Sequence, residues 1–212
     1  MPACCSADSC QPPRPDPGYR RVLWIALALN ASMFLVEAVA SLLAGSVSLQ
    51  ADALDFLGDA GNYALGLAVL GLALHWRARA AIGKGIVMGT FGLWVAGNTL
   101  WHALIGAVPR PDLMGGIGLL ALAVNLCVAM LLFRHRKGDS NRMSVWLCTR
   151  NDAIANVAVI LAACGVWFTG SHWPDIAVAA VIASLGLSSA WKVITQARGE
   201  LQNGAQPVLA GE

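Results

Sequence analysis

Three aspartates lie within one of the most hydrophobic stretches of the chain and could bind a cation there. Asp52, Asp55 and Asp59 occur in SLQADALDFLGDAGNYALGLAVLGLAL. At about 100° per residue, a helix places Asp55 and Asp59 roughly 40° apart, with Asp52 within about 20° of Asp59 and Asn62 on the same stripe. Ionised carboxylates are costly in a bilayer core and usually face a partner, a cavity or a transported ion. The stripe therefore predicts half of a cation site, with Asp52 and Asn62 as accessory candidates.

A second polar cluster, WLCTRNDAIANVAVI, contains a thiol and a carboxylate at helical spacing. Cys148 and Asp152 are four residues apart and share a helix face, which Asn156 and a further accessory candidate, Asn151, flank. Carboxylates of the first cluster, together with this carboxylate and thiol, would make a four-coordinate site that suits zinc, cobalt or cadmium. We therefore predict these metal ligands: Asp55, Asp59, Cys148 and Asp152.

The elements that position these residues must be membrane helices. Of the 212 residues, 57% are hydrophobic and only 12% are charged, whereas soluble domains carry about 25% charged residues. The few basic residues are scattered, which argues against nucleic-acid binding. We therefore predict an all-α integral membrane protein in contact with the lipid bilayer. Apolar runs of spanning length indicate six transmembrane helices, at residues 22–44, 47–75, 85–108, 113–133, 145–169 and 175–195.

Basic residues fix the orientation of these six spans. Of the 14 lysines and arginines, all but Arg110 and Arg150 fall on one side of the membrane, Lys84 among them in the loop between the second and third spans. The positive-inside rule makes that side cytoplasmic. We therefore expect both termini inside, with a transmembrane domain at 22–195 between a Cys- and Pro-rich tail at 1–21 and a short tail at 196–212.

Helical rise predicts that the two polar clusters meet. The second span enters from outside near Val47, so at about 1.5 Å per residue Asp55 and Asp59 lie roughly 12 to 18 Å deep. The fifth span enters from the cytoplasm, which puts Asp152 roughly 12 Å deep from that side. In a core about 30 Å thick both clusters lie near the midplane. Antiparallel packing would level Asp55 with Asp152, and Asp59 with Cys148.

Other polar residues of the spans have more ordinary interpretations. Asp52 is nearest the outer surface, where it could line the access path or bond to backbone. Glu37 could pair with a polar residue of another helix or take part in transport. Lone polar residues in membrane helices usually pack or bond between helices. We expect that role for Asn30, Asn98, Asn125, Cys127 and Cys164.

Three cysteines precede the first span. Cys4, Cys5 and Cys10 fall in a tail predicted to be cytoplasmic, where reducing conditions disfavour disulfides. A three-thiolate cluster could capture a soft divalent ion. An unstructured tail with incidental thiols explains the same residues, and the spacing is not that of a standard zinc finger.

At these residues the chain resembles the cation diffusion facilitator family of divalent metal transporters. The resemblance runs through VEAVASLLAGSVSLQADALDFLGDAGNY, CTRNDAIANVAVI and WPDIAVAAVIASLGLSSAWKVI, and covers about residues 22–195. It implies six helices, a central site made by the second and fifth, and metal–proton antiport out of the cytoplasm. Many members have His then Asp, four apart, in both helices. Asp55/Asp59 and Cys148/Asp152 depart from that pattern, which admits cadmium or cobalt beside zinc.

The family commonly carries a cytoplasmic C-terminal domain that binds metal and dimerises. This chain stops too soon to have it, so we expect a short form whose homodimer, if it forms, is held by the membrane helices. The expected setting is a bacterial inner membrane. No tightly bound cofactor is expected, since the divalent ion is the cargo and protons are the counter-ion.

Two other classes of function compete with efflux. A membrane metal sensor or accessory subunit without transport would fit the cysteine tail. An intramembrane hydrolase would need a complete Gly-x-Gly-Asp or Gly-x-Ser-Gly motif, which Leu57-Gly58-Asp59 and Gly186-Leu187-Ser188-Ser189 only approach. We therefore predict a transporter rather than an enzyme.

Overall fold

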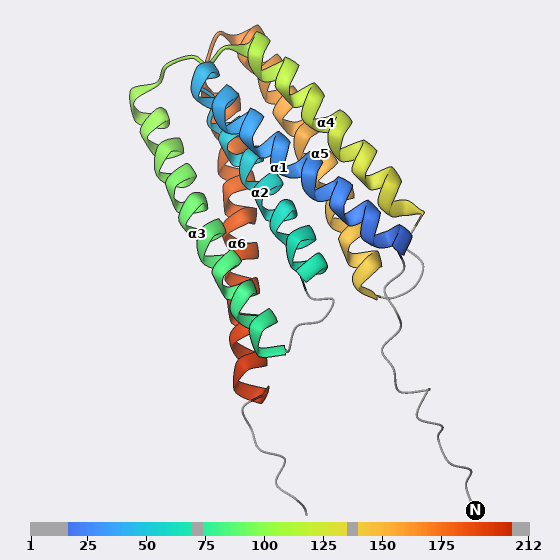
Figure 1. Cartoon of the computed structure of the whole chain (residues 1–212). Coiled ribbons are helices and arrows are strands. Elements are labelled where there is room, and N and C mark those ends of the chain that lie inside the picture. The colour runs from blue at the N-terminus through green and yellow to red at the C-terminus, as the bar shows by residue number, and fades with distance from the viewer. Residues whose placement is uncertain (1–16, 69–73, 135–139, 205–212) are drawn as a thin grey trace, which may run out of the picture.

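Helices make up the described part of the chain. The computed structural model describes residues 17–68, 74–134 and 140–204, without the side chains of residues 74, 75, 77, 140–151, 200 and 203. These residues form α1 (Pro17–Ala44), α2 (Val47–Ala68), α3 (Leu74–Ile105), α4 (Pro111–Phe133), α5 (Ser140–Thr169) and α6 (Trp173–Gly204), shown in Figure 1. The predicted all-α bundle of six helices is confirmed.

Several helices begin or end outside the predicted spans. α1 begins at Pro17, where proline's fixed φ suits a first helical turn, and α6 continues to Gly204. The second span was expected to reach His75, but α2 is described only to Ala68 and α3 begins at Leu74. The intervening sequence, residues 69–73, is as apolar as the helices on either side, so hydropathy cannot locate this boundary. α3 therefore includes Lys84, which the sequence had placed in a loop.

Three helices end in the same way at one end of the bundle. Gly45, Gly106 and Gly170 directly follow α1, α3 and α5, with φ values of 65°, 48° and 60°. Glycine adopts this left-handed conformation without the steric cost of a Cβ, which makes it the usual residue after a helix. The Arg110 N–H also donates to the Ala44 carbonyl over 2.9 Å, which ties the α3–α4 connection to the end of α1.

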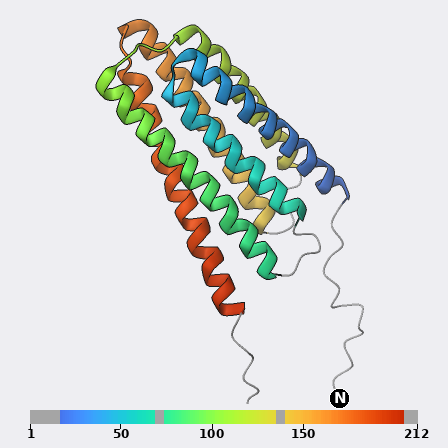
Figure 2. The ribbon, with the colours of Figure 1, turned by 60° about the vertical axis from the view of Figure 1, so that its left-hand side comes forward.

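α2 lies at the centre of the bundle. It packs against α1, α3, α5 and α6, while α4 packs against α1 and α5, and α3 pairs most extensively with α6. Figures 1 and 2 show α1 beginning and α6 ending at the same end of the bundle, as predicted for two cytoplasmic termini. Figure 2 also shows α6 reaching beyond the other helices there.

The outer surface of the bundle is apolar, as a lipid-facing surface must be. Five helices are long and apolar enough to cross a membrane among the described residues: α1, α4, α6 and the parts of α3 and α5 at 78–105 and 152–169. α2 is the exception because of its three aspartates, and it is the helix that the others surround. Cys127 and Cys164, which we expected to pack between helices, are exposed instead.

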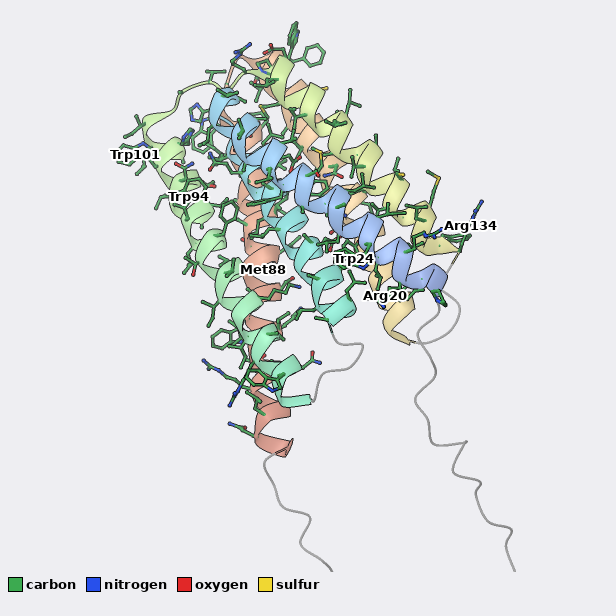
Figure 3. The ribbon with its side chains drawn as sticks, viewed as in Figure 1. Arg20, Trp24, Met88, Trp94, Trp101 and Arg134 are labelled. Atoms are coloured by element: carbon green, nitrogen blue, oxygen red, sulfur yellow. The ribbon has the colours of Figure 1, made fainter. Side chains whose placement is uncertain are left out.

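Aromatic and basic side chains mark the two ends of the bundle. In Figure 3, Arg20 and Arg134 lie at the end where α1 begins, and Trp101 lies near the opposite end. Trp24, Trp101 and Trp191 are exposed, as expected of residues in an interfacial belt. We refer to the end that carries Arg20 and Arg134 as the cytoplasmic end.

Candidate metal site

Of the three aspartates on α2, Asp59 contacts the most polar side chains. Its carboxylate is buried and accepts a hydrogen bond of 3.2 Å from the hydroxyl of Tyr63, one turn further along the helix. It also forms a side-chain hydrogen bond with Asn62 and lies close to the carboxyl of Asp152 on α5. The Asp59–Asp152 contact joins the two polar clusters that the sequence singled out.

Asp55 lies one turn before Asp59 and is half-buried. Its carboxylate is close enough to those of Asp52 and Asp59 for their charges to interact. Carboxylates that crowd together repel one another, and a divalent cation between them would relieve that repulsion. Asp55 and Asp59 therefore present negative charge on one side of α2.

α5 brings Asp152 to the site. We expected Asp55 to be level with Asp152, and the hydrogen bonds between Asp52 and Asn156 of the same two helices fit that register to within one residue, while Asp59 also lies close to Asp152. Cys148 precedes Asp152 by one turn of α5, on the cytoplasmic side. The side chains of Cys148 and Asn151 lie outside the described residues, as do those of Cys4, Cys5 and Cys10.

Asp59 and Asp152 form a pair rather than a complete metal cage. Among the side chains that the structure describes, no three histidine, cysteine or acidic residues stand together in a group that could hold a metal ion. A four-coordinate ion at the Asp59–Asp152 contact would draw its remaining ligands from the neighbouring turns, where Asp55 and Cys148 occur.

Asp52 belongs to a second hydrogen-bond network, nearer the start of α2. Both of its carboxylate oxygens accept hydrogen bonds from the Asn156 amide of α5, over 2.9 and 2.8 Å. The side-chain oxygen of Asn156 in turn accepts a hydrogen bond from the Asn125 side-chain amide of α4, over 2.8 Å. Asp52, Asn125 and Asn156 are all buried. We expected Asp52 to line the access path or to bond to backbone, but it bonds to a side chain of another helix. The expected helix-bridging role of Asn125 is confirmed.

Glu37 of α1 completes this network. It is fully buried, and its carboxyl lies close to that of Asp52. Neither of its oxygens meets an N–H or O–H donor elsewhere in the described part of the bundle. Two ionised carboxylates side by side repel each other, so a proton shared between Glu37 and Asp52 would stabilise this pair.

Asn62 does not direct its oxygen toward the aspartates. The Asn62 amide oxygen accepts a hydrogen bond from the ammonium of Lys84 on α3, and its side chain also bonds to Asp59. Asn62, which we expected as an accessory ligand, therefore bridges Lys84 and Asp59. Asn98, another polar residue expected to bond between helices, does so by donating to Gln50 of α2 over 2.6 Å.

A buried carboxylate on α6 fixes the start of α2. Asp175 accepts hydrogen bonds from the Ser46 hydroxyl (2.7 Å) and from the N–H groups of Val47 (2.9 Å) and Ser48 (3.0 Å). The Ser46 hydroxyl caps the same helix by accepting from the Leu49 N–H over 3.2 Å. The first N–H groups of α2 are thus satisfied, and a negative charge sits at the positive end of the helix dipole.

Sequence reasoning missed Lys84, Tyr63 and Asp175 as residues that position the site. Tyr63 follows Asp59 by four residues, a spacing at which side chains on a helix meet. Asp175 can be recognised in WPD as an acid in the first turn of a helix, but nothing in the sequence indicates that it caps another helix. Lys84 was missed because the third span was begun one residue too late to contain it.

Comparison with known proteins gives consistent matches over nearly the whole bundle. The family model for the cation efflux transmembrane domain matches residues 23–201. The metal cation efflux system protein CzcD of Cupriavidus metallidurans is 27% identical over 203 residues, which cover 88% of this chain and 63% of that protein. The zinc transporter ZitB of Escherichia coli is 28% identical over 214 residues, covering 90% and 64%.

The name of a third relative covers a wider range of ions. The cadmium, cobalt and zinc/H(+)-K(+) antiporter of Bacillus velezensis is 24% identical over 192 residues, covering 82% of this chain and 60% of the antiporter. The chain thus spans just under two thirds of the length of each of these curated relatives.

Proposed function

Because this chain belongs to the cation efflux transmembrane-domain family, we propose that it carries divalent heavy-metal ions out of the cytoplasm. It is an integral membrane protein of the bacterial inner membrane. The observation that supports transport best is the contact of Asp59 with Asp152, because it brings acids of two different helices together inside the bundle. Intramembrane acids of this kind mark ion pathways.

The proposed ligands are Asp55, Asp59, Cys148 and Asp152. Three carboxylates and a thiolate carry four negative charges, more than enough to attract a dication, and the mixture of oxygen and sulfur suits zinc, cadmium or cobalt. The same three metals occur in the name of the Bacillus velezensis relative, and zinc in that of ZitB. A site without histidine favours a broad range over zinc alone.

Proton exchange supplies the proposed driving force. Ligands must be deprotonated to bind a metal ion, so binding from the cytoplasm releases protons. A rocking motion of the bundle then exposes the site outward, where protons compete with the ion for the clustered acids. The ion leaves and the protons travel inward. A homodimer held by the membrane helices stays a further prediction.

Zinc or cadmium flux into proteoliposomes under an imposed pH gradient tests the proposal. Wild-type protein should transport, and Asp59→Ala should lose more than about nine tenths of the initial rate, because a buried ligand charge is gone. Asp112→Asn is the matched control, because Asp112 is an exposed acid at the start of α4. Wild-type flux at the level of empty liposomes would favour the sensor or accessory-subunit alternative, and wild-type flux by Asp59→Ala would refute the site.

Comparing metals in the same vesicles tests the proposed range. Zinc, cadmium, cobalt, manganese and iron are supplied separately at equal concentration. The proposed ligands predict faster transport of the first three, because manganese favours sites made of oxygen ligands alone. Restoring histidine through Asp55→His should shift the preference toward zinc.

A further inference from the structure

A basic side chain lies beside the proposed metal site. Lys84 of α3 donates from its ammonium to the amide oxygen of Asn62, and the Asn62 side chain bonds to Asp59. The charge of Lys84 also acts directly on Asp59. Lys84 is therefore linked to a proposed ligand both through space and through one bridging side chain.

The surface of α2 is shaped to receive α3 at this point. A Cβ atom on Gly61 would lie 3.1 Å from the Lys84 Cδ and Cε atoms, and one on Gly58 would lie 2.8 Å from the Cε atom of Met88. Lys84 and Met88 are one helical turn apart on α3, where Figure 3 labels Met88. Two glycines of α2 thus let the lysine stem lie flat across the helix that carries the aspartates.

The position of Lys84 differs from that of an ordinary surface lysine. The side chain is only half-exposed, whereas Lys192 of α6 is exposed. Lysine stems can run along apolar surface while the ammonium reaches a polar group, and here that group belongs to the metal site rather than to the membrane surface. An ammonium held there offsets part of the negative charge of the aspartates when no metal is bound.

We infer that Lys84 is a tethered countercharge that limits how tightly the site holds a divalent ion. The inference rests on the proposed function. A fixed cation repels an incoming dication, so it weakens binding, and a transporter needs binding that is strong enough to load and weak enough to release. Lys84 acts through Asn62 and Asp59 and is a positioning residue rather than a ligand.

Lys84→Gln tests the charge, with Lys84→Arg and Lys192→Gln as matched controls. Isothermal titration of the detergent-solubilised full chain with zinc should show about three- to tenfold tighter binding for Lys84→Gln, because the repulsion is removed. In proteoliposomes the KM for zinc should fall by a similar factor and kcat should also fall, because release slows. Lys84→Arg keeps the charge and Lys192→Gln removes an exposed one, so both should match wild type.

Gly61→Ala is a second variant that leaves the ammonium in the protein. Its methyl group would displace the lysine stem, so zinc binding should tighten in the same direction by a smaller factor. Zinc affinity that is unchanged or weaker in Lys84→Gln, or a Lys84→Arg variant that behaves like Lys84→Gln, would overturn the inference.

These measurements separate the inference from the proposed function. If wild type transports zinc but Lys84→Gln and Lys192→Gln give equal KM and kcat, the role of Lys84 fails and transport stands. If wild type binds zinc without transporting it, transport fails, and the titrations still decide the role of Lys84.

Discussion

Asp175 and Ser46 are joined by a buried 2.7 Å hydrogen bond that ties the first turn of α6 to the start of α2. The other oxygen of Asp175 accepts from the Val47 N–H, so one carboxylate serves both a side chain and the end of a helix. This relationship holds in place the helix that carries Asp55 and Asp59.

Removing the Asp175 carboxylate should destabilise the bundle. Asp175→Ala leaves buried N–H groups without an acceptor, and we expect a loss of about 2–3 kcal/mol in the free energy of unfolding. Asp175→Asn keeps one acceptor oxygen and should lose about 1 kcal/mol. Thermal unfolding in detergent, followed by tryptophan fluorescence, measures both. Asp112→Asn is the control, and equal melting temperatures for Asp175→Ala and wild type would contradict the capping role.

Asn156 should be the most sensitive asparagine of the bundle. Asn156→Leu removes the donor to Asp52 and the acceptor for Asn125 at once, at a cost of about 2–3 kcal/mol. Asn125→Leu removes one hydrogen bond and should cost about 1 kcal/mol. In the double variant the two costs should not add, because the residues share a bond. Chemical unfolding of the four proteins in one detergent gives the coupling energy, and full additivity would show that the bond contributes nothing.

A neutral hydrogen-bond donor at position 37 should be tolerated beside Asp52. Glu37→Gln presents an amide N–H to Asp52, so its stability should stay within about 1 kcal/mol of wild type. Glu37→Leu fills similar space but offers no donor, and should lose about 2 kcal/mol. Unfolding midpoints at one pH decide the matter. A Gln variant as unstable as the Leu variant would mean that the pair does not depend on a donated hydrogen.

Glycine should be required where α3 meets α6, but not on the lipid-facing side of α3. A Cβ on Gly85 would lie 2.6 Å from Ile194 Cγ1 and 3.3 Å from the Ala190 carbonyl oxygen, so Gly85→Ala should destabilise by about 1–2 kcal/mol. Gly97 has no neighbour within 4 Å of such an atom. Gly97→Ala should therefore be neutral or gain up to about 1 kcal/mol from helix propensity. Melting temperatures that rank the two variants in the opposite order would contradict this packing.

The helices and the meeting of the two polar clusters could be predicted from sequence, whereas the partner of each acid could not. Apolar runs of spanning length and the charge bias were enough for six helices with both ends on one side. Depth was counted from span ends as if every helix stood upright and began in one plane. α5 in fact begins at Ser140, outside the expected span, and helices tilt, so span ends locate a residue along the membrane normal only to within about a turn.

Polar residues of the interior were assigned less well, for a physical reason. Helical spacing shows that Asp52 and Asp59 share a stripe, but not which helix faces each of them. Asp52 meets Glu37 and Asn156, while Asp59 meets Tyr63 and Asp152. Such partners come from helices far apart in sequence, and one chain read by itself has no signal for them.

Because the cap fixes the start of α2, this helix would tilt around its outer end. Asp52 lies about 7.5 Å along the axis from Val47, and Asp59 about 18 Å. A tilt of about 10° around the capped end would move Asp52 by roughly 1.3 Å and Asp59 by roughly 3 Å. The same swing would move Asp59 more than twice as far as Asp52, enough to carry it out of reach of Asp152. A tilt around the capped end would confine large displacements to the cytoplasmic half of the helix.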